Sequence, residues 1–197
     1  MPKIAAPSVA EHRLRQRDAL LRAATELLVT GGVSAVTPAA VGAAAGLSRP
    51  GVYQYFSSGA DILAAVIEDA FPRANESLRN ALDGVAGPER RLETYLRETL
   101  RLAAEGAHRP AAALAAALAA AQLPAECLAR LGELHREQAA PFLAALEELE
   151  VPELQLTARL LAGVIEAAMG AIDTGAPLAL VTEHTLALVR FAVAPRP

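Results

Sequence analysis

Hydrophobic residues recur every three or four positions along most of the chain, which is the period of an amphipathic helix. Leu20, Ala24 and Leu28 follow this spacing in the first such segment, and Ile62 and Val66 follow it in a later one. Together with capping residues and breaks at glycine or proline, the pattern predicts an all-α fold of about nine helices. Two short helices are expected within 37–56, and longer ones at about 8–30, 60–83, 88–105, 109–122, 124–149, 152–174 and 177–193.

The segment from Thr37 to Phe56 contains two helix starts and one tight turn. Thr37 can cap a helix whose first position is Pro38, where no backbone donor is needed. Gly46 can adopt the positive φ of a turn, and Ser48 can cap a second helix. These features predict a helix-turn-helix, which places a short helix in a DNA groove.

The two sides of this segment differ in chemistry. Helical spacing assigns to the buried side Val41, Ala45, Leu47, Val52 and Phe56. On the outer side, the guanidinium of Arg49 can pair with guanine and the carboxamide of Gln54 with adenine, while hydroxyl groups suit phosphate oxygens. The candidate DNA-binding residues are Thr37, Ser48, Arg49, Pro50, Gly51, Tyr53, Gln54 and Tyr55.

The segment resembles the DNA-binding signature of the tetracycline-repressor (TetR) family of regulators. The upstream helix, which ends at Gly31 and Gly32, adds to the resemblance. The signature positions are Thr37, Val41, Ala45, Gly46, Leu47, Ser48, Tyr53 and Phe56. The resemblance implies a DNA-binding domain at 1–58, followed by a helical effector-binding and dimerisation domain at 59–197.

Three glycines depart from the family pattern. Gly42 stands where alanine is usual and should lower helix stability by about 1 kcal/mol. Gly51 stands where threonine, serine or alanine is usual, and Gly59 stands where a lysine often touches phosphate. DNA contacts are therefore expected to be fewer than in the family, and Arg49 correspondingly more important.

Charge is unevenly distributed along the chain. Residues 1–57 contain six basic and three acidic residues, whereas the remainder contains twelve basic and nineteen acidic ones. A basic N-terminal part attracts phosphates and an acidic body is repelled by them, so this distribution favours one orientation on DNA. Scattered surface charge is the alternative explanation.

The N-terminus lacks the apolar segment of a signal peptide, and Ala111 to Ala121 is too short to span a bilayer. A cytoplasmic protein without membrane contact is therefore expected. Cys127 is the single cysteine and suits a buried thiol. No catalytic residue, metal ligand or cofactor site is predicted.

The last two predicted helices are the most apolar, and Gly163 and Gly170 lie seven residues apart on one face of the first of them. In the TetR family the final two helices typically form a four-helix bundle with those of a second subunit. The resemblance thus implies a homodimer interface that includes Leu160, Gly163, Val164, Ala167, Gly170, Leu186 and Val189. Burial of both helices within one subunit is the alternative.

A small-molecule effector that enters a cavity of the C-terminal domain is also implied by the resemblance, but its identity is not predicted. Surface exposure of the polar candidates and ordinary core packing of the apolar ones are the alternatives. The candidate pocket residues are Phe71, Tyr95, His108, Leu114, Gln122, His135 and Phe142.

The interpretation is a homodimeric repressor that an effector releases from a near-palindromic operator in double-stranded DNA. An enzyme is disfavoured because no serine or cysteine lies in a nucleophile motif and no glycine-rich phosphate loop is present. Two alternatives stay open. One is a helical protein-interaction module, and the other is an activator without an effector.

Overall fold

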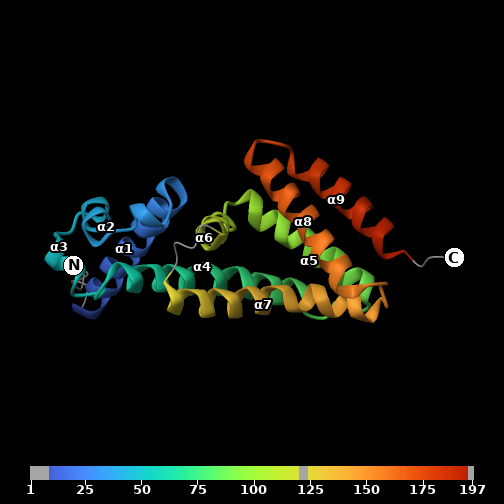
Figure 1. The fold of residues 1–197 in the computed structure, drawn as a ribbon, viewed down its shortest axis with the longest axis horizontal. Coiled ribbons are helices and arrows are strands. Elements are labelled where there is room, and N and C mark those ends of the chain that lie inside the picture. The colour runs from blue at the N-terminus through green and yellow to red at the C-terminus, as the bar shows by residue number, and fades with distance from the viewer. Residues whose placement is uncertain (1–8, 120–123, 195–197) are drawn as a thin grey trace, which may run out of the picture. The chain divides into compact units, whose positions relative to one another are not determined.

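The computed structural model describes residues 9–119 and 124–194 of the protein (Figure 1). These residues form nine α-helices and one short 3₁₀-helix, with no strand among them, and the predicted all-α class is confirmed. The elements are α1 Val9–Gly31, η1 (3₁₀) Val33–Ala35, α2 Pro38–Ala45, α3 Arg49–Val52, α4 Gly59–Leu82, α5 Pro88–Ala104, α6 Arg109–Ala119, α7 Ala125–Glu148, α8 Leu154–Asp173 and α9 Leu178–Val193.

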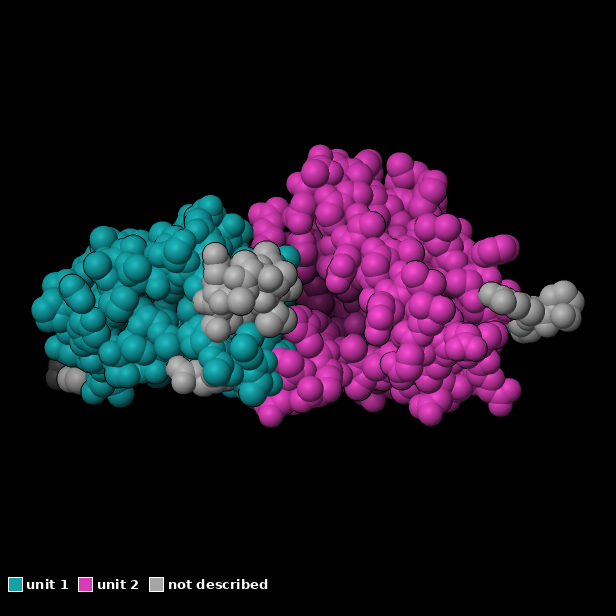
Figure 2. All heavy atoms as spheres, viewed as in Figure 1, with its two compact units in different colours: residues 1–70, 110–131 teal, residues 71–109, 132–197 magenta. Residues whose placement is uncertain are grey.

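The chain divides into two compact units, which Figure 2 distinguishes by colour. Unit 1 comprises residues 1–70 and 110–131, and unit 2 comprises residues 71–109 and 132–197. Helices α4 and α7 each supply residues to both units. The functional domains expected at 1–58 and 59–197 stay a prediction.

Two long helices contain an internal proline. Helix α7 continues through Pro141, from Ala125 to Glu148. Helix α4 likewise continues through Pro72. An internal proline removes one backbone hydrogen bond. The burial of the neighbouring Phe71 and Phe142, 2% and 4% exposed, helps to offset that loss.

The N-terminal part of unit 1 is built on α1, which packs against η1 and α2, while α2 packs against α3. The aliphatic side chains of Leu20, Leu28, Val41 and Val52 are fully buried there, and Phe56 is 5% exposed. The periodicity of α1 and the buried side predicted for 37–56 are confirmed at these positions. A small aliphatic core therefore holds the two short helices against the long one.

Gly42 occupies the closest approach between α2 and the chain that follows it. A Cβ atom at this position would lie 2.8 Å from the Leu47 carbonyl oxygen and 2.8 Å from Cγ2 of Val52. The Leu47 N–H also donates to the Gly42 carbonyl oxygen at 2.8 Å. Gly42 is therefore more than a cost in helix stability, because the packing leaves room only for a glycine there.

The core of unit 2 joins α5, α8 and α9 to the C-terminal halves of α4 and α7. Helix α5 packs against both α8 and α9. Leu96 and Leu146 are completely buried, and Tyr95 lies beside Phe142 with ring centroids 5.6 Å apart. This core fixes which faces of α8 and α9 remain outside.

Helix α8 is long and apolar enough to cross a membrane, judged by length and composition alone. However, Ala158, Leu161 and Ile165 belong to the buried core of unit 2. Packing in unit 2 therefore accounts for one side of α8, whereas Leu156 and Leu160 on the rest of the helix are 56% and 62% exposed.

The packing at Gly42 generates a stability prediction with a matched control. Gly42→Ala should destabilise the protein by about 1–3 kcal/mol. The steric clash of the new methyl group with the backbone should cost more than the roughly 1 kcal/mol gained in helix propensity. Gly51→Ala makes the same change one helix later, where the nearest atom to the added Cβ is Ser48 Oγ at 3.4 Å. It should be neutral or slightly stabilising.

Thermal and urea denaturation of the two variants measure the effect. Equal midpoints for Gly42→Ala and Gly51→Ala would show that α2 and α3 tolerate a wider separation.

Candidate nucleic-acid interface

The two short helices are fixed at their ends by side-chain caps. The Thr37 hydroxyl oxygen accepts from the Ala40 N–H at 3.1 Å, and that of Ser48 accepts from the Gly51 N–H at 3.3 Å. Gly46 ends α2 in the left-handed conformation with φ 71°. All three features were predicted, and the helix-turn-helix geometry is confirmed.

The second helix of this motif is only one turn long. Helix α3 ends at Val52, and turns continue the chain to Tyr55. Arg49, Pro50 and Gln54 are exposed, and Tyr53 is 44% exposed. Candidate base-reading groups thus stand on both a helix and the turn that follows it.

Arg49 and Tyr53 form a pair on the exposed surface. Nη2 of Arg49 donates to the Tyr53 hydroxyl oxygen at 3.3 Å, and the guanidinium carbon lies 5.8 Å from the ring centroid. Both contacts restrict the Arg49 side chain before any ligand arrives. A restrained guanidinium loses less conformational entropy when it binds a guanine edge.

Helix α1 holds the end of the motif from the other side. The Tyr55 hydroxyl donates to Oε1 of Gln16 at 2.5 Å. The Arg13 guanidinium lies 5.8 Å from the Tyr55 ring centroid, and that of Arg17 lies 5.9 Å from the Phe56 ring centroid. Tyr55 is half-buried, so its predicted phosphate contact would require its hydroxyl to leave Gln16.

Serines and an aspartate fix the chain where α4 begins. The Asp61 N–H donates to Ser58 Oγ at 3.0 Å, and Oδ2 of Asp61 accepts from the Ser57 N–H at 3.0 Å and from the Ser57 hydroxyl. These hydrogen bonds from Ser57 hold the pKa of the Asp61 carboxyl below its usual range. At neutral pH the ionised carboxylate keeps the turn attached to α4.

Residues 20–66 match the family model described as bacterial regulatory proteins of the tetR family. This stretch contains both capping residues, the Gly46 turn and the Arg49–Tyr53 pair. Residues 20–66 form a TetR-family DNA-binding domain. TetR proteins are DNA-binding regulators rather than enzymes, and the predicted family is thereby confirmed.

Several solved structures share the fold of this chain. One is a TetR-family transcriptional regulator from Agrobacterium tumefaciens, with a TM-score of 0.75 and 17% identity over 92% of this chain and 99% of that one. The regulator FadR from Bacillus subtilis, in complex with stearoyl-CoA, has a TM-score of 0.70 and 19% identity over 87% of this chain and 96% of that one. AibR, in complex with isovaleryl coenzyme A and operator DNA, has a TM-score of 0.73 and 14% identity over 88% of this chain and 97% of that one. No curated protein sequence matches the chain.

The residues predicted for a TetR dimer interface divide into two sets. Leu160 is 62% exposed, and a Cβ added at Gly163 or Gly170 would meet no atom within 4 Å. Ala167 is exposed and Val164 is half-buried beside it. These five residues lie on an open side of α8.

Leu186 and Val189 do not belong to that open side. They are 3% and 1% exposed in the core of unit 2, because this face of α9 packs against α5. Their assignment to an exposed interface face is corrected accordingly. The exposed apolar residues of α9 are Leu180, Leu188 and Phe191, at 51%, 57% and 86%.

The residues predicted for an effector pocket also separate. Phe71 packs edge-on against His135 with ring centroids 4.8 Å apart, and Tyr95 pairs with Phe142. His108 is bound through Nε2 to Oδ2 of Asp173 at 2.7 Å. Leu114 is buried in unit 1, whereas the five aromatic and histidine residues belong to unit 2. Gln122 lies outside the described residues.

Several residues of both candidate sites had no signal in the sequence. Gln16 is one polar residue among many on α1, and only the fold brings it to Tyr55. In unit 2, Asn75 Oδ1 and His108 Nδ1 are buried with no hydrogen-bond partner among the described residues. Such atoms cost about 1–3 kcal/mol each when left unpaired. They are candidates for contact with a ligand.

Proposed function

We propose that the protein is a homodimeric transcriptional repressor that binds a near-palindromic operator and leaves it when a small molecule binds. The observation that carries this proposal is the capped helix-turn-helix with Arg49, Tyr53 and Gln54 on its exposed side. A dimer that occupies a promoter blocks polymerase without further contacts, which favours repression over activation. Such a repressor of bacterial promoters acts in the cytoplasm, where the DNA lies.

Hydrogen-bond directions refine the role of each hydroxyl group. Ser48 and Thr37 accept from backbone N–H groups, and Tyr53 accepts from Arg49, so each keeps a proton that it can donate to a phosphate oxygen. Tyr55 already donates its proton to Gln16. Ser48, Thr37 and Tyr53 are therefore the better phosphate ligands, and Tyr55 positions the end of the motif.

Arg49 and Gln54 are the proposed base-reading residues. A guanidinium can donate twice to the O6 and N7 atoms of guanine, and a carboxamide can pair with N6 and N7 of adenine. Both side chains are exposed, and α3 contributes no other charged residue. Sequence preference should therefore depend mainly on these two positions.

Arg49→Ala should remove operator preference and leave folding intact, with a loss of about 1–3 kcal/mol of discrimination for each guanine contact. The operator is first obtained by selection from a random DNA pool, and preference is then measured by competition against random duplex. Arg79→Ala removes an exposed arginine from α4 and serves as the control, with preference unchanged. Retained selectivity in Arg49→Ala would refute the assignment.

The open face of α8 and α9 is the proposed dimer interface. Leu160, Leu188 and Phe191 expose more than half of their surface, which is costly for isolated apolar side chains in water. The two glycines of α8 leave room for another helix to approach. A dimer carries two recognition motifs, which suits an operator with two half-sites about 34 Å apart.

Leu160→Glu should convert the dimer into a monomer, because two carboxylates would be buried at the interface. Leu14→Glu is a matched control, since Leu14 on α1 is also 62% exposed. Light scattering after size exclusion gives the mass of each variant. A dimer that persists in Leu160→Glu, at concentrations where the wild type dimerises, would place the interface elsewhere.

The effector is proposed to enter unit 2 and to satisfy its buried polar atoms. Asn75 Oδ1 is an acceptor, so a ligand with an N–H or O–H group beside an apolar chain fits it. Two structures of similar fold contain acyl-CoA thioesters. This makes acyl-CoA the first ligand class to test.

Isovaleryl-CoA or stearoyl-CoA should lower operator affinity at least about tenfold, whereas coenzyme A alone should not. A ligand changes operator affinity only if it binds the DNA-bound and the DNA-free arrangement of the protein with different affinities. Asn75→Leu, which replaces the amide by an apolar group of similar size, should weaken the response. Unchanged operator affinity with both thioesters and across a wider set of apolar compounds would contradict effector control.

A further inference from the structure

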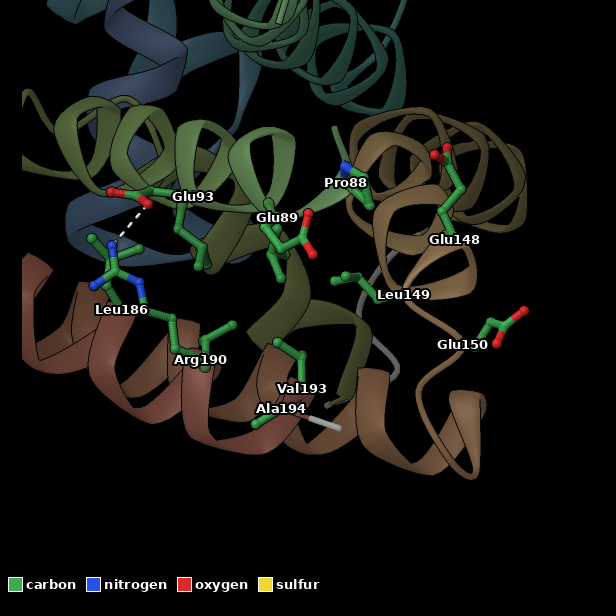
Figure 3. Close-up of a pocket in the computed structure, with 13 residues that line it drawn as sticks. Pro88, Glu89, Glu93, Glu148, Leu149, Glu150, Leu186, Arg190, Val193 and Ala194 are labelled. Atoms are coloured by element: carbon green, nitrogen blue, oxygen red, sulfur yellow. Dashed lines mark hydrogen bonds and ion pairs between the residues drawn. The ribbon is translucent and has the colours of Figure 1, made fainter. Parts of the chain in front are cut away.

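A groove of about 400 Å³ lies between α5, the C-terminal end of α7 and α9 (Figure 3). All of its lining residues belong to unit 2. Its floor is formed by side chains of the unit 2 core, namely Leu92, Leu96, Leu186 and Val189, each at most 3% exposed. The side chains of Leu149 and Val193 point into the same space in Figure 3. The groove is therefore an apolar hollow with a rigid base.

The border of the groove is acidic. Glu89, Glu93, Glu148 and Glu150 line it, against a single cation, Arg190. Two of these carboxylates are partly neutralised by cations. Arg190 and Arg97 each donate to Glu93 at 2.8 Å, and Arg91 is ion-paired with Glu148.

The other two carboxylates, those of Glu89 and Glu150, have no ion-pair partner among the described residues. Glu89 borders the opening on the α5 side, together with the Glu93–Arg190 pair, whereas the Glu150 side chain points outward (Figure 3). Glu89 is therefore the carboxylate that borders the groove opening without an ion pair among the described residues, and Glu150 adds to the negative potential around it.

The groove and the proposed dimer face lie on opposite sides of α9. Residues three or four positions apart share one side of a helix, so Leu186, Val189 and Val193 form one side. Leu180, Leu188 and Phe191 form the other, and these are the exposed residues. Dimerisation through the exposed side leaves the groove accessible.

We propose that this groove binds a small amphipathic cation. The apolar body of the ligand covers the leucine and valine floor, and an ammonium or related positive group lies beside the carboxylates of Glu89 and Glu93. The Arg190–Glu93 ion pair closes one side of the opening and orients the Glu93 carboxylate. Anionic ligands, including fatty acids and acyl-CoA thioesters, are repelled because carboxylates outnumber cations at the border. This site is thus distinct from that of the proposed effector, and the inference does not depend on DNA binding.

Three probes with the same decyl chain test the proposal on the full-length protein below their micelle concentrations. Decyltrimethylammonium should bind at least about tenfold more tightly than decanol, and decyl sulfate should bind more weakly than both, when measured by calorimetry without DNA. Binding of decyl sulfate that equals or exceeds that of the cation would overturn the proposal. No detectable binding of the cation up to its micelle concentration would also overturn it.

Variants locate the site. Val193→Trp fills the groove near the end of α9 and should abolish binding of the cation, while Glu89→Gln should weaken it about three- to tenfold. Glu76→Gln removes an exposed carboxylate of α4 outside the groove and should change nothing. If Val193→Trp fails to fold by circular dichroism, the exposed Glu89→Gln decides the question, and unchanged affinity in it refutes the role of the border charge.

Discussion

The contact between Gly42 and the residues that follow α2 sets the geometry on which the DNA-binding surface depends. With no Cβ on Gly42, the Leu47 carbonyl and Val52 can approach α2, and the Leu47 N–H can close the turn onto the Gly42 carbonyl. The caps at Thr37 and Ser48 then fix where each helix begins. Within this one-turn helix Val52 is buried in the core, whereas Arg49 at its start stays exposed.

A one-turn helix has little stability of its own, so tertiary contacts must hold α3. Val52 supplies one such contact from inside the core, and Gln16 supplies another by accepting from Tyr55. Arg13 and Arg17 add weaker contacts to the two aromatic rings that follow α3. Basic residues on α1, which composition alone associates with phosphate, therefore also help to position the motif.

Helix α9 illustrates how one apolar sequence serves two environments. One side packs against α5 and forms the floor of an acidic groove, whereas the other exposes leucine and phenylalanine to solvent. Periodicity identifies α9 as a helix but does not rank its faces, since both are apolar. The assignment of Leu186 and Val189 to an interface failed for this reason, while Leu160 and the two glycines of α8 do lie on an open side.

The all-α class, the helix-turn-helix and its caps could be predicted from the sequence alone, because these depend on residues within one or two turns of each other. Capping, positive φ at Gly46 and the period of apolar residues are local properties. Only the tertiary structure decided that Gly42 is required by a close contact, that Gln16 holds Tyr55, that Asn75 has a buried and unpaired oxygen, and that four glutamates border one apolar groove. The Gln16–Tyr55 contact and the groove join segments far apart in the chain, and all four features are set by packing rather than by any local preference.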